Sequence, residues 1–185
     1  MCSETWRNPQ TVKLNDGTRI ILRASEPRDL EPTWNMFSTL SRNSLQYLPD
    51  PITRERVEGW FKEINYEETL PILGIIENES GYKVISSTTL HFRKGIYSHV
   101  AGFGITVHDY YQNKGFGQIL TRYMLDIAKR RGVKKLVLSV VSTNHRAIHV
   151  YEKMGFKKEG YKKMDYWNPI LNEYGDTVIM GIILE

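Results

Sequence analysis

A short glycine turn near the middle of the chain has the composition of an anion-binding loop. Residues 112–117 read QNKGFG, and apolar residues at helical spacing follow them. The first N–H groups of a helix have no intrahelical partner, and they lie at the positive end of the helix dipole. Glycines let another group approach these N–H groups closely, and Lys114 adds a cation. The turn therefore predicts a phosphate site at a helix N-terminus.

Two common phosphate loops do not fit this turn. A nucleoside-triphosphate loop reads GxxxxGK[ST], whereas Lys114 precedes the glycines here. A dinucleotide fingerprint would need a third glycine at the position of Leu120. The pattern present is Gln-x-x-Gly-x-Gly, formed by Gln112, Gly115 and Gly117, between the strand-like GITV and an amphipathic helix.

A second pattern, Asn-x-x-Ala-x-x-x-Tyr, is formed by Asn144, Ala147 and Tyr151, and Gly155 and Phe156 follow it. Together and in this order, the two patterns resemble the GNAT superfamily of acyl-CoA-dependent N-acetyltransferases. The resemblance extends from about residue 18 to residue 184. The stretches LNDGTRIILRASEPRDLE, FSTLSRNSLQYL and INYEETLPILGII add a weaker likeness to domains that acetylate protein lysines.

The resemblance implies that acetyl-CoA is the cosubstrate. Its pyrophosphate would lie on the turn, and its pantetheine arm would pair with the preceding strand, where two central parallel strands separate. Asn144 would bind the pantetheine or cap its own helix, which is the ordinary role of Asn at a helix start. The cofactor-binding residues implied in this way are Ile105, Thr106, Val107, Gln112, Asn113, Lys114, Gly115, Phe116, Gly117, Asn144, Ala147 and Tyr151.

Tyr151 is the catalytic residue that the resemblance implies. Acyl transfer expels CoA as a thiolate, and a phenol can protonate that sulfur or donate a hydrogen bond to it. The position one turn after Ala147 also fits an ordinary core tyrosine.

The general base is harder to assign, because an amine must lose a proton before it attacks a thioester. Some relatives carry a glutamate at the position of Gly102 and others at that of Ser139, and neither is present here. A chain of water molecules would serve without any dedicated residue. The remaining candidate side chains are His99, His108, Asp109 and Glu77.

The chain supplies elements that can position these residues. Residues 11–25 predict a hairpin around Asn15-Asp16-Gly17. Strand, turn, helix and strand from 105 to 141 form a βαβ unit, whose two strands should be parallel. We expect four helices: one from near Asp29, one over 53–64, one from Phe116 to before Gly132, and one over 144–154. Strands are expected over 69–77, 82–92, 97–107, 134–141, 156–167 and 174–184. The last two strands are joined through Asn168-Pro169.

The expected fold class is therefore α/β (α+β), the GNAT fold. It has a mixed, mostly antiparallel twisted sheet, one parallel pair at the acetyl-CoA site and about four helices. The 185 residues fit one domain, with an N-terminal extension over 1–10. Cys2 is the single cysteine, so the chain has no internal disulfide. No apolar stretch reaches the roughly 18 residues of a membrane span, and we expect a cytoplasmic protein without metal or membrane partner.

Charge is distributed unevenly along the chain. From Asn113 to Lys163 there are thirteen Lys and Arg residues against three Asp and Glu. A basic half suggests an anionic partner, although for isolated lysines a solvated lysine-rich surface is the favoured explanation. Residues 63–79 hold five glutamates and no Lys or Arg. This segment favours a cationic acceptor, or it is simply a run of solvated glutamates. Candidate acceptor-site walls are Tyr47, Tyr66, Tyr166 and Trp167.

These observations give three hypotheses of function. The first is an N-acetyltransferase that transfers acetyl from acetyl-CoA to a primary amine in a ternary complex. The amine would belong to a protein lysine or N-terminus, a polyamine or another small molecule. The alternative is a non-catalytic acyl-CoA-binding or sensing module on the same fold. Nucleic-acid binding through KKEGYKKMDYW is the third and least favoured. A homodimer stays open.

Overall fold

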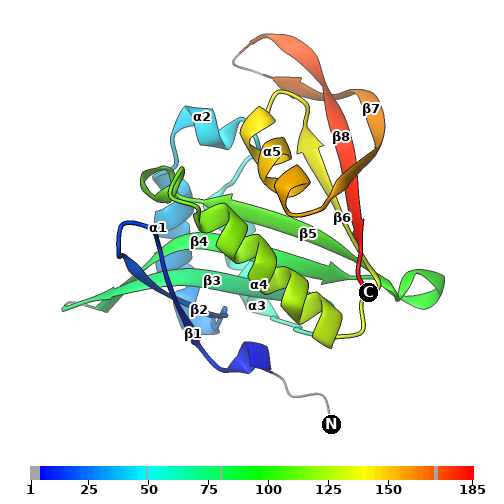
Figure 1. Ribbon diagram of the computed structural model, residues 1–185. Coiled ribbons are helices and arrows are strands. Elements are labelled where there is room, and N and C mark those ends of the chain that lie inside the picture. The colour runs from blue at the N-terminus through cyan, green and yellow to red at the C-terminus, as the bar shows by residue number, and fades with distance from the viewer. Residues whose placement is uncertain (1–4, 49, 80, 169–170) are drawn as a thin grey trace.

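The computed structural model describes residues 5–48, 50–79, 81–168 and 171–185, so Cys2 and Pro169 lie outside the described residues. Its strands form one eight-stranded sheet in the order β1-β2-β3-β4-β5-β6-β8-β7 (Figure 1). Only β5 and β6 are parallel, as the sequence predicts. The strands are β1 Gln10–Lys13, β2 Arg19–Ala24, β3 Thr69–Asn78, β4 Gly81–Phe92, β5 Val100–Val107, β6 Lys135–Val141, β7 Lys157–Asn168 and β8 Glu173–Ile183.

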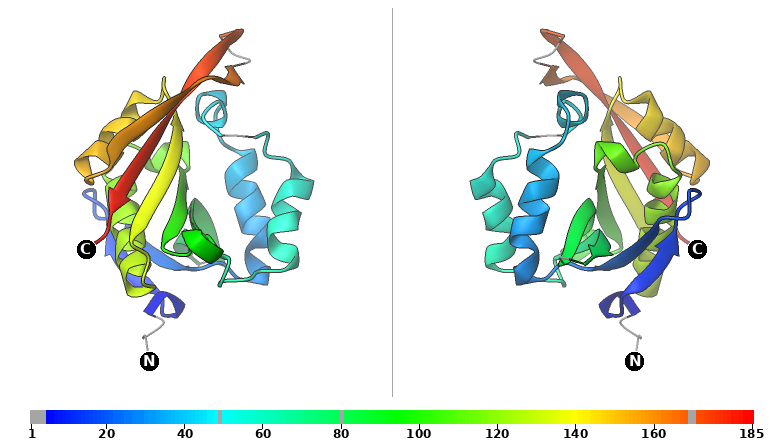
Figure 2. Two further views of the ribbon diagram at one scale, coloured as in Figure 1. Left: turned by 90° about the vertical axis from the view of Figure 1, so that its right-hand side faces the viewer. Right: turned by 90° about the vertical axis from the view of Figure 1, so that its left-hand side faces the viewer.

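Helices cover both faces of this sheet. Figure 2 shows α1 and α3 on one face and α4 and α5 on the other. None of the described helices is long and apolar enough to cross a membrane. The helices are α1 Leu30–Ser38, α2 Arg42–Leu45, α3 Arg54–Lys62, α4 Phe116–Arg130 and α5 His145–Lys153, and the short 3₁₀ turns are η1 Thr5–Arg7, η2 Pro27–Asp29, η3 Gly95–Tyr97 and η4 Asp109–Tyr111.

Two details differ from the sequence-based expectation. The helix α2 was not predicted, because a four-residue helix shows no periodicity; it forms where Ser41 caps it by accepting from the Ser44 N–H. The strand expected over 97–107 begins at Val100, because residues 95–97 form the turn η3. Gly95 supports that turn with a φ of 64°.

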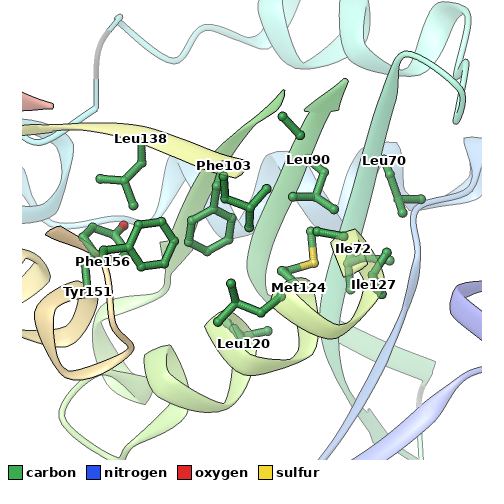
Figure 3. Close-up of a cluster of buried hydrophobic side chains, with 14 of the residues drawn as sticks. Leu70, Ile72, Leu90, Phe103, Leu120, Met124, Ile127, Leu138, Tyr151 and Phe156 are labelled. Carbon is green, nitrogen blue, oxygen red and sulfur yellow. The ribbon is translucent and has the colours of Figure 1, made fainter. Parts of the chain in front are cut away.

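The sheet is buried on both faces because successive strand residues point to opposite sides. On one face, the apolar stripe of α4 packs against β3 and β4, with Leu120 and Met124 near Leu90 (Figure 3). On the other face, α1 and α3 bury a separate cluster made by Met36, Phe37, Leu40, Val57, Leu73, Ile75 and Val84. Trp6, in the expected N-terminal extension, is 4% exposed and packs in the α4-side core.

A buried ion pair joins β2 to the start of α1. The Arg23 guanidinium donates to both carboxylate oxygens of Asp29 at 2.6 Å, and the Tyr82 hydroxyl donates to the same carboxylate at 2.6 Å. Burial alone would raise the pKa of Asp29, but these bonds and the Glu26 N–H stabilise the anion and give a net lowering. The carboxylate is therefore fully satisfied although it is inaccessible to solvent.

Removal of the Asp29 charge should destabilise the fold. Asp29→Asn leaves Arg23 buried without its counter-ion, and we expect a loss of about 3–5 kcal/mol in the free energy of unfolding at pH 7. Because the pKa is lowered on folding, this contribution is present above about pH 4 and lost as the pH falls further. Urea denaturation at pH 7 and at a pH below about 4 measures this contribution to the free energy of unfolding. Glu31→Gln in α1, which breaks the exposed pair with Arg54 of α3, is the control and should cost less than about 1 kcal/mol.

Candidate functional site

The two parallel strands β5 and β6 separate after three paired residues. Val100, Ala101 and Gly102 pair with Lys135, Leu136 and Val137, and no later pair follows. Beyond this point β5 stays paired with β4 up to Val107, and β6 stays paired with β8 up to Val141. The result is a wedge-shaped opening between the carboxyl ends of β5 and β6, with its vertex at Gly102.

Backbone groups along one side of this opening are directed into it. At the closed end, the carbonyl of His99 accepts from the Lys135 N–H of β6 at 3.1 Å. Alternate residues of a strand direct their backbone groups to opposite neighbours, so Phe103, Ile105 and Val107 direct theirs towards the opening. An extended ligand could pair with this edge as a further strand would.

The glycine turn lies at the wide end of the opening. Asn113 and Gly115 have φ values of 60° and 76°, and Gly115 is the N-cap of α4. Within the described part of the chain, no N–H group of residues 113–117 donates a hydrogen bond. Phe116 is 1% exposed, so only its backbone can meet a ligand. The turn presents a set of bare N–H donors at the positive end of a fifteen-residue helix, which suits a phosphate.

The polar side chains of the turn are already engaged within the protein. Lys114 Nζ lies 3.0 Å from an Asp16 carboxylate oxygen and 4.6 Å from the centroid of the Tyr110 ring. The hydrogen bond to Asp16 raises the pKa of Lys114. Gln112 Nε2 donates to the Val107 carbonyl at 2.7 Å and to Ser44 Oγ at 3.1 Å. Gln112 therefore holds the turn in place, and Lys114 can reach an anion only in competition with Asp16.

Asp109 is one of the four candidate bases, and it has a structural role. Its carboxylate accepts from the Ser41 N–H at 2.8 Å, from Ser41 Oγ at 2.6 Å and from Ser44 Oγ at 2.7 Å. Burial raises the pKa of Asp109, but these hydrogen bonds outweigh it and lower the pKa to about 2. Such an anion is a poor proton acceptor at neutral pH, and its bonds instead hold α2 beside the glycine turn.

The other three candidates lie away from the vertex. His99 is at the closed end, before the first residue pair of β5 and β6. Glu77 is on β3 opposite Tyr82, beyond the level at which β4 pairs with Val107. His108 follows β5 at the turn, with Nε2 3.2 Å from Thr39 Oγ1, and burial is the main cause that lowers its pKa.

Tyr151 of α5 lies beside the opening. Its ring packs edge-on against Phe103 of β5 at 6.1 Å and lies 5.7 Å from Phe156 (Figure 3). The side chain is 7% exposed, and burial raises the pKa of its phenol. No described residue hydrogen-bonds the hydroxyl. Tyr151 is thus a core tyrosine by packing and also a protonated donor without a protein partner.

Asn144 begins α5 as its N-cap. Its side-chain oxygen accepts from the Ala147 N–H at 3.1 Å, so that oxygen serves the helix. The neighbouring helix α4 approaches closely here, because a Cβ added at Gly117 would lie 3.9 Å from Val150 of α5. A side chain in the first turn of α4 would therefore project into the space between the two helices.

The segments that carry Tyr47, Tyr166 and Trp167, three of the four predicted acceptor-site walls, meet beyond the carboxyl end of β6. The Tyr166 hydroxyl contacts Thr143 Oγ1, in the loop before α5, at 3.2 Å. Asn168, next to the exposed Trp167, contacts Gln46, next to Tyr47, at 3.5 Å. Figure 1 shows the β7–β8 hairpin and α2 at the same end of the molecule.

Tyr66 is the exception among the predicted walls. Its ring packs 5.1 Å from that of Trp6, and its hydroxyl donates to the Ser25 carbonyl at 2.6 Å. It belongs to the core on the α4 side and does not line the acceptor end.

A pocket of about 380 Å³ lies on another side of α5. Its walls come mainly from α5 and from β7 and β8, and both of these strands lie beyond β6 in the sheet, on the side away from β5. It therefore lies outside the opening, and we assign the chemistry to the opening because its backbone groups and Tyr151 converge there. The pocket is lined by Ser142, His145, Ile148, Glu152, Lys158, Tyr161 and Val178.

The basic half of the chain is partly neutralised in the fold. Lys135 pairs with Glu159 and Lys158 with Glu152, at 2.8 Å and 3.0 Å. Lys163 pairs with Asp176 at 2.7 Å. These pairs weaken the case for a continuous nucleic-acid surface, which would need its cations available for phosphates.

Residues 34–156, which hold the glycine turn, both parallel strands and all of α5, match the sequence model of the Acetyltransferase (GNAT) family. The chain belongs to the GNAT acetyltransferase family. The fold agrees: the GNAT domain of Streptomyces lividans PAT superposes with a TM-score of 0.77 at 18% identity, covering 98% of each chain.

Two further GNAT proteins are similar to this chain. The [ribosomal protein bS18]-alanine N-acetyltransferase of Escherichia coli is 34% identical over 80 residues, which are 43% of this chain and 53% of the relative. The chain thus spans about half the length of the curated relatives it matches first. The spermidine N-acetyltransferase of Vibrio cholerae, solved with CoA and spermine, is 25% identical with a TM-score of 0.74, covering 89% of this chain and 95% of that one.

A carboxylate in the first turn of α4 should abolish acetyl-CoA binding. Gly117→Glu places an anion where we expect the pyrophosphate, while the space around Gly117 admits a side chain without a clash. Gly59→Glu is the matched control, because Gly59 lies on α3 with nothing within 4 Å of an added Cβ. Calorimetric titration with acetyl-CoA measures both, and unchanged affinity in folded Gly117→Glu would remove the phosphate site from this turn.

Proposed function

We propose that this GNAT protein is an N-acetyltransferase that transfers the acetyl group of acetyl-CoA to a primary amine by direct attack in a ternary complex. The observation that carries the proposal is the opening between β5 and β6, which joins an unpaired strand edge to a turn of bare N–H groups. A CoA ester is long enough to need both, because its pantetheine amides pair like a strand and its pyrophosphate suits a helix start.

The predicted residues take these roles in the proposal. The N–H groups of residues 113–117 bind the pyrophosphate, with Lys114 joining once it leaves Asp16. Ile105 offers both backbone groups to the pantetheine arm and Val107 offers its N–H, because the Val107 carbonyl already accepts from Gln112. This pairing brings the thioester towards the vertex. The Tyr151 phenol, kept protonated by burial, donates to the leaving thiolate. Gln112 and Asn144 support the site by holding the turn and the start of α5.

The acceptor is proposed as a primary amine, because the names of both curated and structural relatives specify amines. One relative acts on a ribosomal-protein alanine and the other on spermidine. The glutamate-rich segment 63–79 gives less support for a cationic acceptor than its sequence suggests. Glu67 pairs with Arg131 and Glu68 with Lys94, both at 2.6 Å, so their charge is compensated within the protein.

A panel of acceptors tests this assignment. We expect polyamines, amino acids, lysine peptides and peptides with a free N-terminus to release CoA thiol from acetyl-CoA faster than alcohols or acidic acceptors without an amine. Free thiol is followed with a colorimetric reagent. Hydroxyl acceptors that clearly outperform amines would overturn the proposal. Acetyl-CoA binding without thiol release from any acceptor would favour the alternative, a non-catalytic acyl-CoA-binding module. The absence of a carboxylate at Gly102 and at Ser139 also favours that alternative.

Tyr151→Phe should slow acetyl transfer while acetyl-CoA still binds. Loss of a positioned acid is worth roughly 10²–10⁴-fold in rate, and CoA is a good enough leaving group that the lower part of this range is expected. Pre-steady-state measurement of acetyl transfer separates chemistry from product release. Tyr123→Phe is the control, because the Tyr123 hydroxyl of α4 is buried without a partner among the described residues. Wild-type chemistry in Tyr151→Phe would refute the acid role.

A further inference from the structure

The vertex of the opening carries a histidine that the sequence analysis did not consider. On the sheet face covered by α1 and α3, Gly102 of β5 lies beside His91 of β4 on one side and Val137 of β6 on the other. His91 shares this face with Gly102, because directly paired residues project to the same side of a sheet. Gly102 is also the last residue of β5 that pairs with β6.

The imidazole lies close to the space that a side chain at position 102 would occupy. A Cβ added at Gly102 would be 3.5 Å from His91 Cβ and 4.0 Å from the Cδ2 of the ring. The residue as a whole is exposed, although its ring lies partly between β3 and β5, and Nδ1 lies 3.4 Å from Thr69 Oγ1 of β3. The glycine thus leaves room for the histidine at the position where the family resemblance led us to expect a carboxylate.

We propose that His91 is the general base of acetyl transfer, acting directly or through one water, an assignment that rests on the proposed function. The acceptor ammonium gives a proton to the imidazole, and the freed amine attacks the thioester carbon. The carbon–nitrogen bond forms and the carbon–sulfur bond breaks as the tetrahedral intermediate collapses. The nitrogen loses its second proton, which restores the Tyr151 phenol after that phenol has protonated the leaving thiolate. The imidazolium returns the first proton to bulk solvent, so the products are the amide, the CoA thiol and one proton.

The state of His91 suits this role. Partial burial between β3 and β5 lowers its pKa, so the ring is neutral at physiological pH and can accept a proton. The residues that face it from the paired strands, Thr69 and Gly102, do not titrate. Charged residues flank it at Arg93, just after the end of β4, and at Glu68 and Lys94, which pair with each other at 2.6 Å.

A carboxylate on the other side of the vertex is the competing candidate. Glu159 of β7 folds over Gly181 of β8, where an added Cβ would lie 2.4 Å from its Oε1, and Gly181 pairs with Val137. This carboxylate also pairs with Lys135 at 2.8 Å. We favour His91 because it is next to β5, whose edge receives the thioester, and because no described residue forms an ion pair with it.

His91→Ala and His91→Gln test the assignment. Both should bind acetyl-CoA as the wild type does and keep its melting temperature, because His91 is exposed. Acetyl transfer to the best amine of the panel should fall at least about tenfold near pH 7, towards the 10²–10⁴-fold typical of a positioned base. The deficit should shrink as the pH approaches the pKa of the amine, about 10 for an alkylamine, because the acceptor then needs no base. In the wild type, the rate of acetyl transfer should fall as the pH drops below about 6.5, and this fall should be absent in both variants.

A second substitution distinguishes chemistry from structure. Gly102→Glu in the His91→Ala background should restore part of the rate, because it returns a proton acceptor to the same place, whereas Gly102→Gln should not. His99→Ala, at the closed end of the strand pair, is the matched histidine control and should leave the rate unchanged.

Other outcomes overturn the assignment. Full activity in His91→Ala, or a collapse in Glu159→Gln with His91→Ala unaffected, would exclude His91 as the base while leaving the proposed function intact. A wild-type protein that releases no thiol with any amine would refute both.

Discussion

The strands β5 and β6 each keep one neighbour along their whole length and lose each other after Gly102. Everything assigned to this site depends on that separation. It leaves one edge of β5 without a protein partner in the middle of a sheet, where an unpaired edge is otherwise unfavourable. On the face covered by α4 and α5, Phe103 of β5 and Leu138 of β6 lie in the same buried core, so side chains of both separating strands pack together there (Figure 3).

Hydrogen bonds that converge on Ser41, Ser44, Asp109 and Gln112 connect the start of α2 to the glycine turn at the wide end of the opening. These bonds join α2, at the proposed acceptor end, to the turn that we assign to the pyrophosphate. Because a charged carboxylate at the centre accepts three of them, the connection is stronger than a set of neutral contacts. The geometry of the acceptor end therefore depends on residues of the cofactor turn, which explains why Asp109 is a poor candidate for a base.

Glycine has two distinct roles in the site. At Gly115 it permits the left-handed conformation that begins α4, which a side chain would strain. At Gly102 the backbone is ordinary, and what matters is the empty volume next to His91. The first role is readable from a motif, whereas the second depends on what the neighbouring strand places there.

Local patterns in the sequence determined the elements, the parallel strand pair, the cofactor turn and the family resemblance, since each depends on residues near one another in the chain. The cap at Asn144 and the apolar stripe of α4 belong to this group. The tertiary structure alone decided which side chains meet across strands. It paired Lys114 with Asp16, engaged Asp109 with two serines, buried Tyr66 against Trp6 and placed His91 beside Gly102. These partners are separated by 11 to 98 residues, and no local pattern encodes such contacts, because strand register and helix packing set them only when the whole sheet has formed.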